Sequence, residues 1–309
     1  MFPVVGRESS DRGEIVCGVW LDPDMSEHDL GGEVTRVLLV GDVHGNTGAA
    51  FQVIDHAASL GADLIVQVGD WGFWGDQGGQ TFQRKVERRL AVLGLDLWWV
   101  RGNHEDQPRL AALPVDADGR RQISEHVWNL PDGYRWKWDD TTWVAVGGAV
   151  SVDKALRTEG KNWFASEELT DEQAARIIAD GPADVVVSHD APLGVPFLRR
   201  LLRQHLPAWR RESPWPTGTV IRSDEHQRRI RQVVEGVGAR RLFHGHHHIR
   251  YSDTLAAAHG PVAIEGLGMD TDPLPARCCL VDSAGNLAHP SRGCRRGLNP
   301  PVSSRLLAM

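Results

Sequence analysis

The sequence lacks the marks of membrane-spanning, exported and duplex-binding proteins. No run of about 18 apolar residues occurs in its 309 residues, and the first 30 have no basic start followed by an apolar stretch. We therefore expect no membrane association and a cytoplasmic location. The formal net charge of −7 argues against a broad cationic surface for duplex nucleic acid. Arg and Lys do gather between Arg199 and Arg231, where a solvated helical face is favoured over a phosphate- or nucleic-acid-binding patch.

Cysteine is also scarce. The four cysteines show no Cys-x-x-Cys spacing, which argues against a disulfide framework or a zinc knuckle. Histidine and tryptophan are abundant instead, with 14 and 12 residues, and the histidines concentrate beside Gly and Asp. This placement is the first indication of metal chemistry.

Hydrophobic periodicity predicts an α/β protein. Short apolar runs, many of them β-branched, alternate with segments of helical spacing, and Thr170 and Ser223 can each cap a helix. This alternation favours a parallel-rich core, while closely spaced runs in residues 123–148 and again after Ile249 predict antiparallel additions. The apolar runs are Val37 to Val40, Leu64 to Val68, Leu97 to Val100, Trp143 to Val146, Val185 to Val187 and Leu242 to Phe243. Residues 35–285 are predicted to form one domain, between an irregular extension at 1–34 and an irregular tail at 286–309.

Five of these strands end in residue types that bind metal ions. Loops at the carboxyl ends of strands in an open α/β sheet converge on one crevice, so we expect these side chains to meet. Aspartate, histidine and asparagine without thiolates suit Mn²⁺, Fe, Zn²⁺ or Ni²⁺. In chain order the residues are Asp42 and His44, Asp70, Asn103 and His104, His189, and His246 and His248.

At these residues the chain resembles the calcineurin-like metallophosphoesterase superfamily, whose blocks run D-x-H, G-D, G-N-H-[ED], H and G-H-x-H. The resemblance covers about residues 35–270 and implies an α/β fold, a four-layer αββα sandwich with two mixed β-sheets. It also implies two divalent metal ions, with Mn²⁺ favoured over Fe, Zn²⁺ or Ni²⁺. The ligands implied are Asp42, His44, Asp70 and His248 for the first ion and Asp70, Asn103, His189 and His246 for the second, with Asp70 bridging.

The activity implied is hydrolysis of phosphate mono- or diesters, nucleotide-type esters among them. A metal-bridging hydroxide would attack phosphorus at the centre that Asp70 bridges, and His104 would protonate the leaving oxygen. A phosphoester substrate is thus the expected partner, and no oligomeric state is predicted. Two alternatives stay open: a protein serine/threonine phosphatase, which the run from Arg101 to Glu105 resembles, and a non-catalytic scaffold with the same fold. The complete ligand set counts against the scaffold, because burying such groups without metal is unfavourable.

The chain departs from the family pattern after Asp70. Many relatives have a second aspartate in a G-D-x-x-D-R block, and Phe73 stands at that position here. His104 therefore lacks its usual carboxylate partner, and Asp76, Asp106, solvent or a backbone group could orient it instead.

Two further residues are candidates for substrate binding. Trp74 follows the bridging aspartate closely and either packs the loop or offers a ring on which a base stacks. Arg157 either clamps a phosphate or lies in a solvated loop. Asp190, directly after His189, either lies behind the ligands or on the surface.

Overall fold

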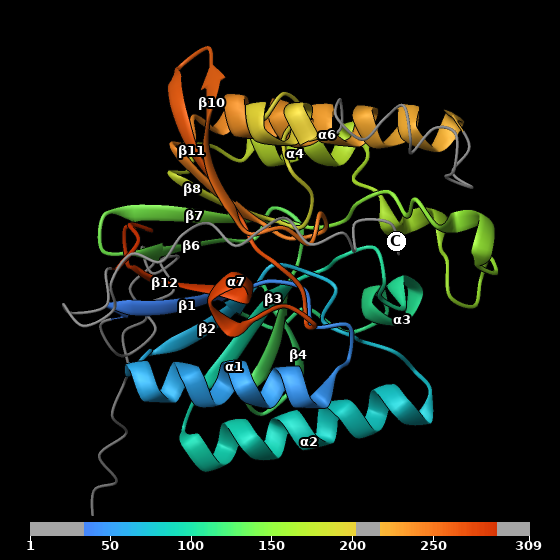
Figure 1. The fold of residues 1–309 in the computed structure, drawn as a ribbon, viewed down its shortest axis with the longest axis vertical. Coiled ribbons are helices and arrows are strands. Elements are labelled where there is room, and N and C mark those ends of the chain that lie inside the picture. The colour runs from blue at the N-terminus through green and yellow to red at the C-terminus, as the bar shows by residue number, and fades with distance from the viewer. Residues whose placement is uncertain (1–33, 202–216, 289–309) are drawn as a thin grey trace, which may run out of the picture.

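The computed structural model describes residues 34–201 and 217–288. In this part of the chain two six-stranded β-sheets pack face to face, and helices cover both outer faces (Figure 1). The layers follow the order αββα, and each sheet contains parallel and antiparallel neighbours, so the predicted fold class is confirmed. The predicted N-terminal extension lies almost wholly outside the described residues, as does the predicted tail beyond residues 286–288.

The first sheet has the strand order β12-β1-β2-β3-β5-β4. Its four inner strands run parallel, and the edge strands β12 and β4 pair antiparallel to their neighbours. Helices α1 and α2 cover its outer face, and α3 and α7 are short connections. The strands are β1 (Arg36–Val40), β2 (Leu64–Gln67), β3 (Asp96–Val100), β4 (Arg121–Ser124), β5 (Val127–Leu130) and β12 (Cys278–Asp282). The helices are α1 (Thr47–Leu60), α2 (Gln77–Leu93), α3 (Gln107–Ala111) and α7 (Leu274–Arg277).

The second sheet has the strand order β10-β11-β9-β8-β7-β6. Its inner strands β7, β8, β9 and β11 are parallel, and β6 and β10 close the two edges as antiparallel hairpins. Helices α4 and α6 cover its outer face. The strands are β6 (Arg135–Trp138), β7 (Thr141–Val146), β8 (Val185–Ser188), β9 (Arg241–His244), β10 (Tyr251–Ala257) and β11 (Gly260–Gly266). The helical elements are α4 (Asp171–Ala179), α6 (Thr217–Val237) and the 3₁₀ turns η1 (Lys154–Leu156) and η2 (Ala165–Glu167).

Local sequence explains where two helices begin. Asn46 caps α1 by accepting bonds from the backbone N–H groups of Gly48 and Ala49. Thr170 caps α4, as predicted, and forms a reciprocal capping box with Gln173. Each such cap contributes about 1 kcal/mol. No helix in the described segments combines the length and apolar character that crossing a membrane requires.

Tryptophan fills much of the space between the sheets. Trp98 projects from β3 of the first sheet, and Trp136, Trp138 and Trp143 project from β6 and β7 of the second. The ring centroids of Trp98 and Trp136 lie 6.0 Å apart, and those of Trp138 and Trp143 lie 5.0 Å apart. This layer accounts for part of the high tryptophan content and fixes how the two sheets face one another.

Candidate metal centre

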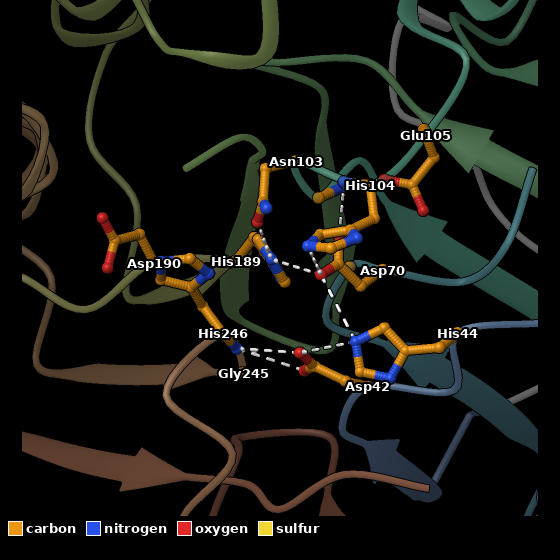
Figure 2. A network of polar contacts seen from close by, with 12 residues as sticks. Asp42, His44, Asp70, Asn103, His104, Glu105, His189, Asp190, Gly245 and His246 are labelled. Atoms are coloured by element: carbon orange, nitrogen blue, oxygen red, sulfur yellow. Dashed lines mark hydrogen bonds and ion pairs between the residues drawn. The ribbon is translucent and has the colours of Figure 1, made fainter. Parts of the chain in front are cut away.

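The predicted ligands come together although they leave five different strands. Asp42 and His44 follow β1, Asp70 follows β2, and Asn103 follows β3 of the first sheet. The remaining three histidines follow β8 and β9 of the second sheet, so the site lies where the two sheets meet. Figure 2 shows Asp42, His44, Asp70, Asn103, His189 and His246 lying close together.

Asp42, His44 and His248 form one group of possible ligands, with one atom from each lying within 4.8 Å of the others. His248 Nε2 lies 2.9 Å from Asp42 Oδ2, and His44 Nε2 lies 3.8 Å from the same oxygen. These are three of the four residues that the resemblance assigns to the first ion.

Asp42, Asp70 and His189 form a second such group. His189 Nε2 lies 3.4 Å from Asp70 Oδ2 and 3.0 Å from the side-chain oxygen of Asn103. His246 stands beside this group rather than within it, with its ring 5.1 Å from that of His189. The structure thus brings together six of the seven predicted ligands and leaves His246 at the margin.

One carboxylate oxygen faces both groups. Asp70 Oδ2 lies 3.6 Å from His44 Nε2, as well as 3.4 Å from His189 Nε2 (Figure 2). A bridging ligand needs this position, because a pair of catalytic cations about 3.5–4 Å apart must share a carboxylate oxygen or a solvent molecule.

Burial makes the charges of this cluster interdependent. Asp42, Asp70 and His189 are at most 1% exposed. Burial raises the pKa of the Asp70 carboxyl, but the imidazoles of His189 and His104 outweigh it and leave that pKa well below its usual range. Burial likewise disfavours charge on His189, and Asp70 and Asp42 nevertheless raise its pKa to about 10. Buried carboxylates need a positive charge nearby, and the imidazoles beside them can bind a metal ion in their neutral form. This donor set suits divalent cations of borderline hardness.

The backbone at these residues is unusual. Positive φ angles occur at His44 (49°), Asp70 (55°), His246 (61°) and His248 (54°). In the described segments only Asp139 shares this conformation among residues other than glycine. The left-handed conformation is unfavourable by roughly 1–2 kcal/mol per residue, so strain is concentrated at the predicted ligands, as is common at functional sites.

Two glycines allow the carboxylates their positions. A Cβ atom at Gly102 would lie 2.1 Å from Asp70 Oδ1, and one at Gly245 would lie 2.1 Å from Asp42 Oδ1. Any larger residue at either position would push a ligand oxygen away. This close approach explains why the G-N-H and G-H-x-H blocks carry glycine.

His104 is oriented by Arg157, which the sequence did not predict. Nη2 of Arg157 lies 2.6 Å from His104 Nδ1 and 2.9 Å from Nε2, and Arg157 also pairs with Asp153 at 2.7 Å. Asp76 and Asp106 cap α2 and α3 instead, so neither is the partner that replaces the missing aspartate. Burial lowers the pKa of His104 to about 4, with Asp70 opposing and Arg157 adding to the decrease. A guanidinium only donates, so the imidazole accepts from it in its neutral form.

The aromatic run after Asp70 divides between two roles. Trp71 and Phe73 are buried in the core, so they pack the loop and are not accessible to a substrate. Trp74 is half-buried, donates a hydrogen bond from Nε1 to the His104 carbonyl, and lies against Gly45. It is therefore the one member of the run that combines partial exposure with contact to site residues.

Two buried hydrogen-bond networks lie behind the ligands, and the sequence predicted neither of them in full. Asp190 is fully buried and accepts from His226 Nδ1 at 2.9 Å and His247 Nε2 at 3.1 Å, so of its two predicted placements the one behind the ligands is confirmed and the surface one is excluded. Ser151 and Glu167 stand in line behind Asn103. Neither network has a local sequence signal, because each joins residues from separate elements.

Comparisons with known proteins bear on the family and the fold. The family model for calcineurin-like phosphoesterases matches residues 35–250. Among solved structures, a dimetal phosphatase from Danio rerio is 12% identical with a TM-score of 0.50, over 81% of this chain and 93% of that chain. A protein of Thermus thermophilus is also 12% identical with a TM-score of 0.49, over 82% of this chain and 97% of that chain. The likeness to the Danio rerio structure concerns the fold alone. No curated protein matches the chain.

Proposed function

Because this chain belongs to the calcineurin-like phosphoesterase family, we propose that it hydrolyses phosphate mono- or diesters, nucleotide-type esters among them, at a centre of two divalent cations. The observation that carries the proposal is the Asp70 carboxylate, whose Oδ2 lies 3.6 Å from His44 and 3.4 Å from His189. An oxygen in this position is suited to serve two ions.

Each group of side chains has a distinct task in this proposal. One ion would be held by Asp42, His44, Asp70 and His248, and the other by Asp70, Asn103, His189 and His246. When bound, two such cations, most readily Mn²⁺, lower the pKa of water towards neutrality and neutralise charge on the phosphoryl oxygens. Oxygen and nitrogen donors of this kind also accept Fe, Zn²⁺ or Ni²⁺.

Arg157 and His104 act on the substrate in sequence. The Arg157 guanidinium, which contacts the imidazole in the free protein, can pair with a phosphoryl oxygen when substrate enters, because an anionic phosphoryl group attracts it more strongly than a neutral ring does. This frees a ring nitrogen of His104 to take up a proton from solvent, and His104 then delivers that proton to the leaving oxygen. Trp74 offers its half-buried ring to a base or aryl group at the mouth of the site.

The test combines metal counting with hydrolysis. Protein loaded with Mn²⁺ is assayed on a monoester, a diester, a cyclic nucleotide and a phosphopeptide. Asp70→Asn should abolish turnover and reduce bound Mn²⁺. Asp184→Asn is the matched control, because Asp184 bonds Thr142 N and Arg240 at the start of β8, away from the site. Full activity in the Asp70 variant would refute the proposal.

The other arms of the same assay separate the rival functions. Turnover of the phosphopeptide alone would favour a protein serine/threonine phosphatase. Two bound Mn²⁺ ions with no turnover of any ester would favour a non-catalytic scaffold. We expect hydrolysis of a small ester or nucleotide, because Trp74 presents an aromatic surface close to His104.

A further inference from the structure

A line of three buried polar side chains runs inward from Asn103. Its Nδ2 donates to Ser151 Oγ at 3.0 Å, and Ser151 Oγ donates to Glu167 Oε2 at 2.6 Å. The other carboxylate oxygen of Glu167 accepts from the Ser151 backbone N–H at 2.8 Å. Asn103, Ser151 and Glu167 are 2%, 1% and 0% exposed, so water cannot substitute for any of these partners.

When Glu167 is ionised, the hydrogen-bond direction along this line has one solution. An ionised carboxylate only accepts, so the Ser151 hydroxyl must donate its single proton to Glu167. Its lone pairs then accept, and the group that faces them on Asn103 must be the NH₂. The carboxamide oxygen therefore points the other way, where it lies 3.0 Å from His189 Nε2.

We propose that Ser151 and Glu167 are positioning residues that hold the Asn103 carboxamide with its oxygen toward the second cation. The inference rests on the proposed function, because it takes Asn103 as a metal ligand. A carboxamide turned by 180° would present NH₂ to the ion, and an NH₂ group cannot bind it. The polarity that selects the correct face thus originates at Glu167, 64 residues further along the chain.

The alternative is that Glu167 only holds the loop of residues 151–167 in place. Its backbone oxygen does accept from Ala149 N and from Arg101 Nη1. Those bonds use the main chain and survive any side-chain change. A Glu167→Gln substitution keeps the size of the side chain and its bond to the Ser151 N–H, and alters only the polarity toward Ser151 Oγ.

The experiment measures Mn²⁺ affinity by titration calorimetry at pH 8. Burial raises the pKa of Glu167 to about 7, so its carboxylate is ionised at that pH. In Glu167→Gln the new NH₂ donates to Ser151 Oγ, and the hydroxyl proton is left to turn toward Asn103. We expect the affinity for the second Mn²⁺ to fall about 10–100-fold, the usual range when the partner of a ligand is lost. Glu235→Gln removes the same charge from a surface pair with Arg231 and should leave the affinity unchanged.

A second background makes the sign of the effect decisive. Asn103→Asp places acceptors on both sides, so the new carboxylate and Glu167 compete for one Ser151 proton and Mn²⁺ affinity falls. Adding Glu167→Gln removes this competition and reverses the hydrogen bonds. The glutamine NH₂ then donates to Ser151 Oγ, and the Ser151 hydroxyl donates to the aspartate. Glu167→Gln should therefore weaken Mn²⁺ binding in the Asn103 protein and strengthen it about 10-fold in the Asn103→Asp protein.

The outcomes separate this inference from the proposed function. Equal losses of affinity in both backgrounds, accompanied by equal drops in melting temperature, would mean that Glu167 only stabilises the loop. An unchanged affinity in both would also overturn the proposal. Wild-type protein that binds two Mn²⁺ ions without hydrolysing any ester would refute the proposed function alone, because the calorimetric comparison needs no turnover. Wild-type protein that binds no Mn²⁺ would refute both.

Discussion

Replacing Gly102 by alanine adds one methyl group at the point where the loop after β3 touches Asp70. The new Cβ would lie 2.1 Å from Asp70 Oδ1, whereas real Cβ atoms essentially never approach within 3.0 Å of a non-bonded heavy atom. The oxygen must therefore move by about 0.9 Å, or the loop must move with it. Metal–ligand distances tolerate only about ±0.2 Å. The displacement is several times larger than the site can absorb.

We expect Gly102→Ala to lose turnover and to bind less Mn²⁺ in both positions, because Asp70 faces both groups of ligands. Overpacking by one methyl group should also lower the free energy of unfolding by about 1–3 kcal/mol. Calorimetric titration gives the stoichiometry, and thermal unfolding confirms that the variant is folded. Gly102 has no positive φ angle, so backbone strain does not confuse the comparison.

Gly218→Ala is the matched control. Gly218 lies in α6, and a Cβ there would meet nothing within 4 Å. Alanine should leave metal binding unchanged. Two bound Mn²⁺ ions and full turnover in Gly102→Ala would refute the reasoning, because Asp70 could not then be the shared ligand.

Three further predictions concern the surroundings of the centre. His104→Ala should lower kcat about 10²–10⁴-fold on an alkyl ester but much less on a p-nitrophenyl ester, whose leaving group needs no proton, with bound metal near wild type; equal losses on both esters would exclude acid catalysis. Trp74→Ala should raise KM for nucleotide or aryl esters more than for a small alkyl phosphate; a uniform effect with a lower melting temperature would indicate packing alone. Burial raises the pKa of Glu167 from 4.5 to about 7. Between these two pH values the folded protein retains a proton that the unfolded chain releases. The free energy of unfolding of metal-free protein should therefore fall on the order of 3 kcal/mol as pH rises from 4.5 to about 7. Denaturant unfolding at pH 5 and pH 8 should show this slope in wild type and a flatter one in Glu167→Gln, and identical slopes would contradict it.

Much of the fold could be predicted because its signals are local. The apolar runs that begin at Val37, Leu64 and Leu97 correspond to β1, β2 and β3, and the predicted bounds agree with the observed ones to within one residue at each end. The Thr170 cap was also correct. The Ser223 cap was wrong, because α6 already begins at Thr217 and Ser223 lies inside it. The ion pair between Arg222 and Glu168, contributed by another segment, supports the earlier turns of the helix.

In the site, too, the features with a local sequence signal could be predicted and those that depend on tertiary contacts could not. The positions of Asp42, Asp70 and His189 could be predicted because each closely follows a buried strand, and strand ends meet at one edge. The contact between Arg157 and His104 joins residues 53 apart in the sequence, and no local pattern records it. The left-handed backbone at Asp70 also went unpredicted, because its cost is outweighed only by tertiary contacts.

The tryptophan layer between the sheets offers a spectroscopic signal that reports whether the two sheets stay packed together. Trp98 belongs to the half of the fold that supplies Asp42 and Asp70, and Trp136 belongs to the half that supplies His189. Their rings cross at 84° with centroids 6.0 Å apart, and aromatic rings held in such fixed packing give rise to near-ultraviolet circular dichroism. This near-ultraviolet signal is lost if the halves part while each keeps its helices and strands. Ions bound between the halves would tie them together, so we expect chelation to weaken the near-ultraviolet signal before any secondary structure melts.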